Sequence, residues 1–170
     1  MPQIHLETFI AAPAEVCFDL CLNVTAHEQA GHGRAIASIT SGQMKLGDTV
    51  TWEATHFFVR QRLTSKIVAY DRPHMFVDEM QRGIFKRWRH LHRFVARRGG
   101  TLMIDDVDFA APFGLLGRLA DALLLNHYMT RFLVRHNEHF KRMAEVKADD
   151  PQAQQLVAGK SNTIELAPEA

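Results

Sequence analysis

The strongest constraint in this sequence is a change of hydrophobic period near residue 110. Before it, short segments rich in Val, Thr, Ile and aromatic residues alternate between apolar and polar positions, as β-strands do. After it, from Leu115 to about Val146, apolar residues recur at spacings of three and four, which predicts one helix of roughly thirty residues. Such a helix cannot bury its apolar stripe alone, so it must pack against the sheet that precedes it.

The strand pattern predicts an antiparallel meander. Tight turns at Asp71-Arg72-Pro73 and Arg98-Gly99-Gly100 join consecutive segments. A short helix is expected from Pro13 to about Leu22, and a second short helix or a loop over residues 23–33. The predicted strands are Gln3–Ile10, Arg34–Ser41, Asp48–Phe58, Arg60–Tyr70, His74–Arg82, Lys86–Arg97 and Thr101–Phe109.

Length and charge narrow the class of protein. The 170 residues suit one domain, expected over residues 1–147, and the polar residues 148–170 are expected to be a disordered tail. A net charge of +1 gives no reason to expect nucleic-acid binding. Without an apolar run of about 20 residues or a signal-peptide pattern, we expect a cytoplasmic protein with no integral membrane association. Cys17 and Cys21 are expected to be buried free thiols.

This order of elements resembles the START-like or SRPBCC superfamily, which includes plant pollen allergens, lipid-transfer START domains and polyketide cyclases. Residues 10–19, the Gly99-Gly100-Thr101 turn and Pro112-Phe113-Gly114 before the long helix carry the resemblance. Further segments resemble an uncharacterised bacterial ligand-binding branch; they are residues 46–52, 71–73, 76–80 and 90–94. The resemblance covers about residues 3–146. It implies an α+β helix-grip fold, in which a curved, seven-stranded antiparallel sheet wraps around the C-terminal helix and leaves an internal pocket.

Strand alternation predicts which side chains face that pocket. In the strand over residues 86–97, arginines occupy one face, so the other face must point inward. Alternation in the other strands and the apolar stripe of the long helix extend the set. The predicted ligand-binding residues are Trp52, His56, Leu63, Phe76, Asp78, Met80, Trp88, His90, His92, Phe94, Met103, Asp105, Met129 and Leu133.

A polar cluster within this apolar lining suggests the function. Its members are His56, Asp78, His90, His92 and Asp105, and ionisable groups are costly in an apolar setting unless they are paired. A mostly apolar pocket with a few polar groups favours a small, largely hydrophobic, partly polar ligand. We therefore expect a carrier or sensor, monomeric or homodimeric, that uses no cofactor.

Three alternatives remain open. The cluster could serve a cyclase-like or dehydratase-like enzyme, with His92 or His90 as the base and Asp78 or Asp105 as the orienting group. His90 and His92, with His56 and a carboxylate, could hold Zn²⁺ or Fe²⁺, although the expectation here is no metal. The protein could instead be a partner-binding module that uses the sheet edge.

Two further patterns have simpler interpretations. The basic residues of the outer sheet face are expected to be solvated and to pair with Glu79 or Asp108; they are Arg82, Lys86, Arg87, Arg89, Arg93, Arg97 and Arg98. The run His136-Asn137-Glu138-His139 superficially resembles a zinc-protease helix, but its histidines are three residues apart and not four. It is expected to lie on a solvated helix face.

Overall fold

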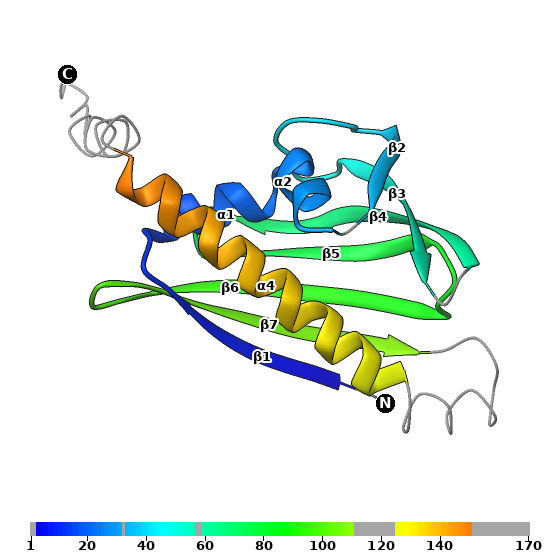
Figure 1. Ribbon diagram of the computed structural model, residues 1–170. Helices are drawn as coiled ribbons and strands as arrows, with labels where there is room; N and C mark the ends of the chain where they lie inside the picture. The colour runs from blue at the N-terminus through cyan, green and yellow to red at the C-terminus, as the bar shows by residue number, and fades with distance from the viewer. Residues whose placement is uncertain (1–2, 32, 57–58, 111–124, 151–170) are drawn as a thin grey trace, which may run out of the picture.

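The computed structural model describes residues 3–31, 33–56, 59–110 and 125–150 (Figure 1). Within them, three helices are labelled α1 (Ala14–Cys21), α2 (Val24–Gln29) and α4 (Asn126–Asp149). The strands are β1 (Gln3–Ile10), β2 (Arg34–Ser38), β3 (Thr49–His56), β4 (Val59–Asp71), β5 (Met75–Arg82), β6 (Arg87–Arg97) and β7 (Gly100–Ala110).

All these strands belong to one seven-stranded sheet in the order β1-β7-β6-β5-β4-β3-β2. Every neighbouring pair is antiparallel. Strands β2 to β7 follow one another as a meander, and β1 pairs with β7 to complete the sheet. The predicted α+β fold, with its antiparallel sheet and long C-terminal helix, is therefore confirmed.

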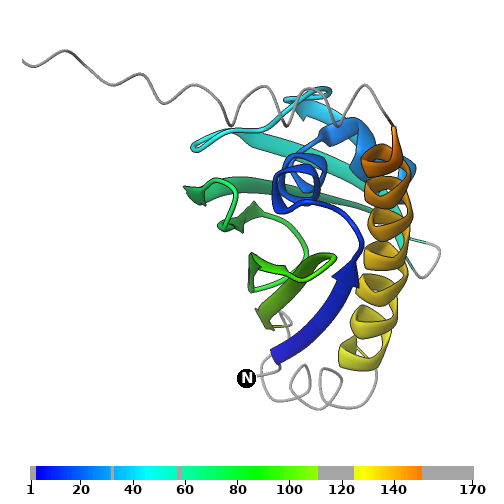
Figure 2. The ribbon, with the colours of Figure 1, turned by 90° about the vertical axis from the view of Figure 1, so that its left-hand side faces the viewer.

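The sheet curves around α4, which lies along its concave side (Figure 2). Strand β4 contributes to this curvature, because its pairing with β5 shifts register between Thr64 and Ser65 and again between Ile67 and Ala69. Such bulges bend a strand and increase its twist. Helix α4 packs chiefly against β1 and α1. It therefore lies closest to one edge of the sheet.

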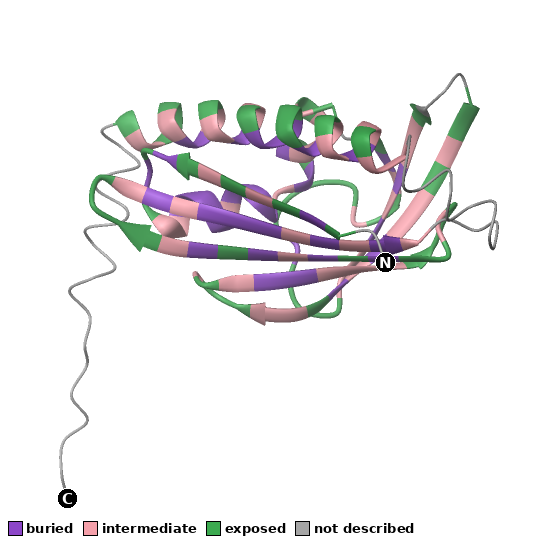
Figure 3. Cartoon of the chain, turned by 90° about the horizontal axis from the view of Figure 1, so that it is seen from below, coloured by how far each residue is buried: buried purple, intermediate pink, exposed green. Residues whose placement is uncertain are grey.

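Helix α1 closes one end of the space between sheet and helix. Phe18 is completely buried there and makes edge-on ring contacts with Tyr70, Phe76 and Phe94, at centroid distances of 5.2, 5.6 and 5.5 Å. Burial is concentrated on the inner positions of the strands and on the face of α4 that is turned toward the sheet (Figure 3). This end of the domain is thus a packed aromatic core.

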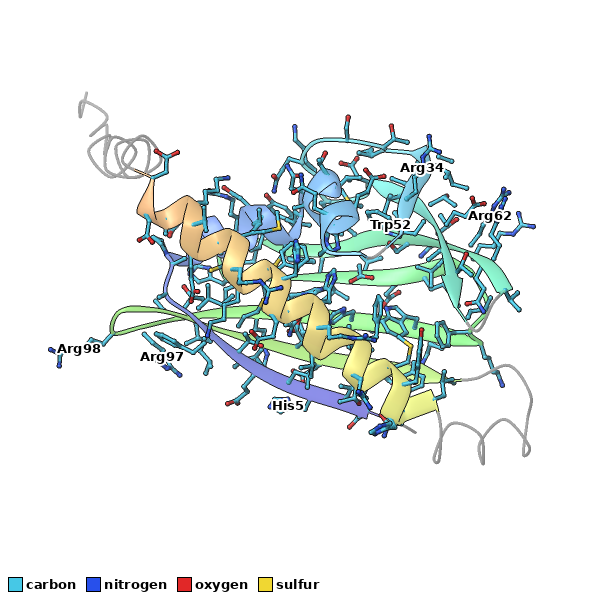
Figure 4. All side chains as sticks on the ribbon, in the orientation of Figure 1. His5, Arg34, Trp52, Arg62, Arg97 and Arg98 are labelled. Carbon is cyan, nitrogen blue, oxygen red and sulfur yellow. The ribbon has the colours of Figure 1, made fainter. Side chains whose placement is uncertain are left out.

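The outer face of the sheet carries paired charges, as predicted. Figure 4 shows Arg97 and Arg98 projecting at the β6–β7 hairpin, where Gly99 takes the positive φ of 82° that the turn requires. Cross-strand ion pairs on this face include Arg89–Glu79 at 3.0 Å, Arg93–Asp106 at 2.6 Å and Arg87–Asp108. These arginines are consequently neutralised locally.

Element bounds differ from the predicted ones in a few places. Strand β2 ends at Ser38 and not at Ser41, because Ser38 takes a positive φ of 64° that an extended strand does not allow. Helix α4 ends at Asp149, close to the expected end at Val146. The first part of the predicted helix, residues 115–124, and the predicted tail beyond residue 150 lie outside the described residues. No helix in the described ranges is both long and apolar enough to cross a bilayer.

The aromatic contacts of Phe18 predict a large effect of its removal. We expect Phe18→Ala to lower the free energy of unfolding by about 3–5 kcal/mol, because it leaves a cavity between α1 and the sheet. Phe9, which is 43% exposed on β1, is the matched control, and Phe9→Ala should cost less than about 1 kcal/mol. Urea denaturation measures both; equal losses would contradict the assignment of the core to the α1 end.

Candidate ligand-binding site

A cavity of about 140 Å³ lies between α4 and the concave side of strands β3 to β6. The cavity exists because α4 packs chiefly against β1 and α1, while the remaining strands curve away from α4. Most of its wall is apolar, and Trp52 and Trp88 stand in that wall on β3 and β6. Trp52, labelled in Figure 4, also contacts His27 of α2, with ring centroids 5.5 Å apart.

The predicted ligand-binding residues divide into two groups. Those that line the cavity are Trp52, Leu63, Phe76, Asp78, Trp88, His90, His92, Met129 and Leu133. Those that are inward-facing or packed in the core without lining it are Met80, Phe94, Met103 and Asp105. The side chain of His56 lies outside the described residues.

Helix α1 is the reason that Phe94 and Met103 do not line the cavity. Phe18 covers Phe94, and the Cys21 thiol donates a weak hydrogen bond to the sulfur of Met103, at 3.8 Å. Alternation along a strand assigns a side chain to one face of the sheet. It does not tell which element covers that position.

Many lining residues fall outside the predicted set. Strand alternation places four of them on the inward face: Val50, Ala54, Ser65 and Ile67. Helical spacing could have found two more, because Phe132 and His136 follow Met129 and Leu133 by three residues. His27 carried no such signal. Among the described residues, the additional lining residues are Cys21, Leu22, His27, Met44, Val50, Ala54, Gln61, Arg62, Ser65, Ile67, Ile84, Phe85, Leu125, Tyr128, Phe132 and His136.

At one wall, two histidines of β6 lie between two aspartates. The rings of His90 and His92 are 3.7 Å apart, centroid to centroid. Asp105 Oδ1 lies 3.1 Å from His90 Nε2 and 2.8 Å from His92 Nδ1. On the other side, Asp78 Oδ2 lies 3.8 Å from His90 Nδ1 and 3.4 Å from His92 Nε2. Strand register builds this arrangement, since His90 is opposite Asp78 on β5 and His92 is opposite Asp105 on β7.

Asn137 ties this cluster to the long helix. Its side-chain amide donates hydrogen bonds to Asp105 Oδ2 at 2.6 Å and to Thr8 Oγ1 of β1 at 3.3 Å. His136 and Asn137 are both buried, so the prediction that they lie on a solvated helix face is wrong. They are three and four residues after Leu133, which places them on the same buried stripe of α4.

The cluster has a distinct electrostatic state. Burial would lower the pKa of His92, but its contacts with Asp105 and Asp78 raise that pKa to about 9. Burial likewise opposes ionisation of Asp105, yet His90 and His92 hold its pKa well below the usual range. At neutral pH the wall therefore contains a cationic His92 beside an anionic Asp105.

Three buried groups near the cluster, His27, Cys17 and Cys21, are neutral at neutral pH. Burial lowers the pKa of His27 to about 4, and a ring nitrogen of this neutral histidine donates to the Cys21 carbonyl at 2.6 Å. Burial also raises the pKa of Cys17 to about 11 and that of Cys21 well above its ordinary value. The two cysteines are buried free thiols, as predicted.

This geometry limits the chemistry of the wall. A protonated His92 can donate hydrogen bonds or act as an acid, but at neutral pH it has no lone pair to serve as a base. Asp78 is the most exposed member, with 18% of its side chain accessible, and offers a carboxylate to a ligand in the cavity. One donor atom from each of Asp78, His90 and His92 also lies within 4.8 Å of the others, close enough to hold a metal ion.

Comparisons with known proteins agree on the fold. No family model matches the sequence, and no match is found among curated proteins. Several solved structures are similar to the chain. The alignment with TTHA0849 of Thermus thermophilus has a TM-score of 0.65 at 16% sequence identity, and it covers 84% of this chain and 99% of TTHA0849. For a START superfamily protein of Mycobacterium smegmatis the TM-score is 0.59 at 14% identity, and the alignment covers 91% of this chain and 98% of that protein. For the major latex-like protein 151 of Panax ginseng the TM-score is 0.62 at 13% identity, and the alignment covers 84% of this chain and 96% of that protein.

These similarities place the chain in a structural class. It has the START-like or SRPBCC helix-grip fold, which the resemblance of its sequence motifs implied. At these identities the likeness concerns the fold and does not transfer a ligand or a reaction.

The His92–Asp105 pair predicts a pH-dependent stability. Folding raises the pKa of His92 from 6.5 to about 9, so the protonation of His92 stabilises the fold fully below pH 6.5. This contribution to the free energy of unfolding is lost as the pH rises through 9. We expect the free energy of unfolding to fall by up to about 3 kcal/mol over that window. His92→Gln should lack this decline. Urea titrations of both proteins at a series of pH values test it; parallel profiles would show that His92 is not protonated in the folded state.

Proposed function

We propose that this protein binds a small, largely hydrophobic molecule in the cavity between α4 and the sheet, and carries or senses it in the cytoplasm. The observation that supports this most directly is the cavity itself, which is mostly apolar with one polar wall. An apolar cavity with a few convergent polar groups is the usual anatomy of a small-molecule site.

The size of the cavity favours a compact ligand. At about 140 Å³ it is close to the volume of an engineered protein cavity of about 150 Å³ that accepts benzene. Aromatic side chains line it from both layers, namely Trp52, Phe76 and Trp88 from the sheet and Tyr128 and Phe132 from α4. A single aromatic ring with a short substituent fits this lining better than a lipid with two chains.

The polar wall favours a ligand with a hydrogen-bond donor. Asp78 presents its carboxylate beside the cavity, and Asp105 behind the histidines keeps their rings in place. A ligand hydroxyl that donates a hydrogen bond to Asp78 would replace the water that this carboxylate loses when the ligand binds. A methyl group of the same size would leave the carboxylate without that hydrogen bond. We therefore propose a phenol-like ligand.

The enzymatic alternative has less support. A cyclase-like or dehydratase-like reaction that starts by removing a proton needs a free base at neutral pH, and the high pKa of His92 disfavours it in that role. No observation on the described residues specifically favours the partner-binding alternative, and Arg87, Arg89 and Arg93 on the outer face of the sheet are already paired with acidic residues.

Matched ligands test the proposal. The chain has two tryptophans, and both line the cavity, so their indole N–H signals in a ¹⁵N-correlation spectrum report on its occupancy. We expect p-cresol to shift both signals and to bind at least about tenfold more tightly than p-xylene, the matched ligand that replaces the hydroxyl with a methyl. Asp78→Asn should reduce this preference.

A pair of variants controls for binding elsewhere. Leu133→Phe adds volume inside the cavity and should weaken p-cresol binding by at least about tenfold. Val134→Phe also adds a bulky ring, but on the outer face of α4, where Val134 is 43% exposed, and should leave binding unchanged. Binding that survives Leu133→Phe, or shifts of neither indole signal with any ligand, would contradict the proposal.

A further inference from the structure

We infer that Asp78, His90 and His92 form a binding site for one divalent transition-metal ion, of the Zn²⁺ or Fe²⁺ class, at the polar wall of the cavity. The inference does not depend on the organic ligand proposed above. It rests on the geometry of the three donor groups, on the residues behind them and on the chemistry of the set.

The three donor atoms lie close to one another. His90 Nδ1 and His92 Nε2 lie 3.8 and 3.4 Å from the same oxygen, Asp78 Oδ2. In a tetrahedral site with bonds of about 2.0–2.1 Å, neighbouring donor atoms are about 3.3 Å apart. The three atoms lie within 4.8 Å of one another, so small side-chain rotations would bring them to that spacing.

The two sides of the histidine pair differ in a way that suits a metal. On the Asp105 side, His90 Nε2 is hydrogen-bonded to the carboxylate at 3.1 Å, and His92 Nδ1 lies 2.8 Å from the same oxygen without the alignment of a hydrogen bond. On the Asp78 side, the distances of 3.4 and 3.8 Å exceed the usual length of an N–H···O bond. Asp105 is thus in close contact with both histidines, whereas the nitrogen–oxygen distances on the Asp78 side are near the spacing between donor atoms in a tetrahedral metal site.

Asp105 also provides the support that metal-binding histidines usually have. Histidine ligands commonly bond their second ring nitrogen to a carboxylate, which fixes the tautomer and the ring orientation. Here Asp105 Oδ1 is hydrogen-bonded to His90 Nε2 at 3.1 Å and forms a close ion contact with His92 Nδ1 at 2.8 Å, and Asn137 donates to the other oxygen of Asp105 at 2.6 Å. The pairing of β5, β6 and β7 keeps all these backbones in register.

The donor set selects the class of ion. Two neutral imidazoles and one carboxylate suit Zn²⁺ or a non-haem Fe²⁺ and disfavour Ca²⁺ or Mg²⁺, which prefer oxygen donors. An ion that binds here therefore displaces the proton of His92. Three protein donors leave at least one coordination position open. Because all three residues line the cavity, that position would face the space where a ligand binds.

Titration with Co²⁺ tests the site, using full-length protein stripped with a chelator and with no organic ligand present. We expect one equivalent of Co²⁺ to bind with the intense visible absorption of a four- or five-coordinate ion, and Zn²⁺ to displace it. His90→Gln and His92→Gln should abolish this absorption. Asp105→Asn keeps all three donors, and should weaken binding by about 10–100-fold without changing the stoichiometry.

His74→Gln is the control for surface binding, since His74 is exposed and lies 3.4 Å from Asp71. It should leave the titration unchanged. If a histidine variant does not fold, as judged by circular dichroism, Asp78→Asn at the edge of the cluster provides the same test. Weak binding with the pale spectrum of hexa-aqua Co²⁺, or tight binding that persists in the folded His90, His92 or Asp78 variants, would overturn the inference. Either result would leave the proposed binding of p-cresol untouched.

Discussion

The structure depends on how the buried charge of Asp105 is compensated. This carboxylate is only 1% exposed, and an isolated charge in that position would cost several kcal/mol. His90 and His92 from the adjacent strand and Asn137 from α4 compensate it together. Because its partners come from the sheet and from the helix, the same interaction fixes the position of α4 over the sheet and gives the cavity its polar wall.

The remainder of the cavity follows from how two layers of different shape meet. A straight helix can contact a curved sheet along only part of its width, and α4 does so chiefly at β1, while it also packs against helix α1. Phe18 and its aromatic neighbours fill one end of the space that is left. The other part stays open between the tryptophans of the sheet and the aromatic residues of α4. Binding capacity is therefore a consequence of the same curvature that lets the sheet hold the helix.

Much of this arrangement was predictable from local patterns, for identifiable reasons. The arginines at 87, 89 and 93 required an exposed face, which forced His90 and His92 inward. Other parts were not predictable in this way. The burial of Asn137 depends on a partner 32 residues earlier in the chain, and polar residues of a helix are by default assigned to solvent. Phe94 and Met103 had the correct parity, but α1 covers them, and strand periodicity carries no information about a helix that packs on top.

The sequence by itself determined the class of fold, the order of the elements and the inward parity of the strands, because hydrophobic period and turn residues act locally along the chain. Only the tertiary structure decided which inward residues line the cavity, that one aspartate lies on each side of the two histidines, and that His92 is charged at neutral pH. Those properties depend on distances and burial between elements far apart in sequence. The strand register, the curvature of the sheet and the position of α4 set these distances. None of the three can be derived from the local pattern of a single segment.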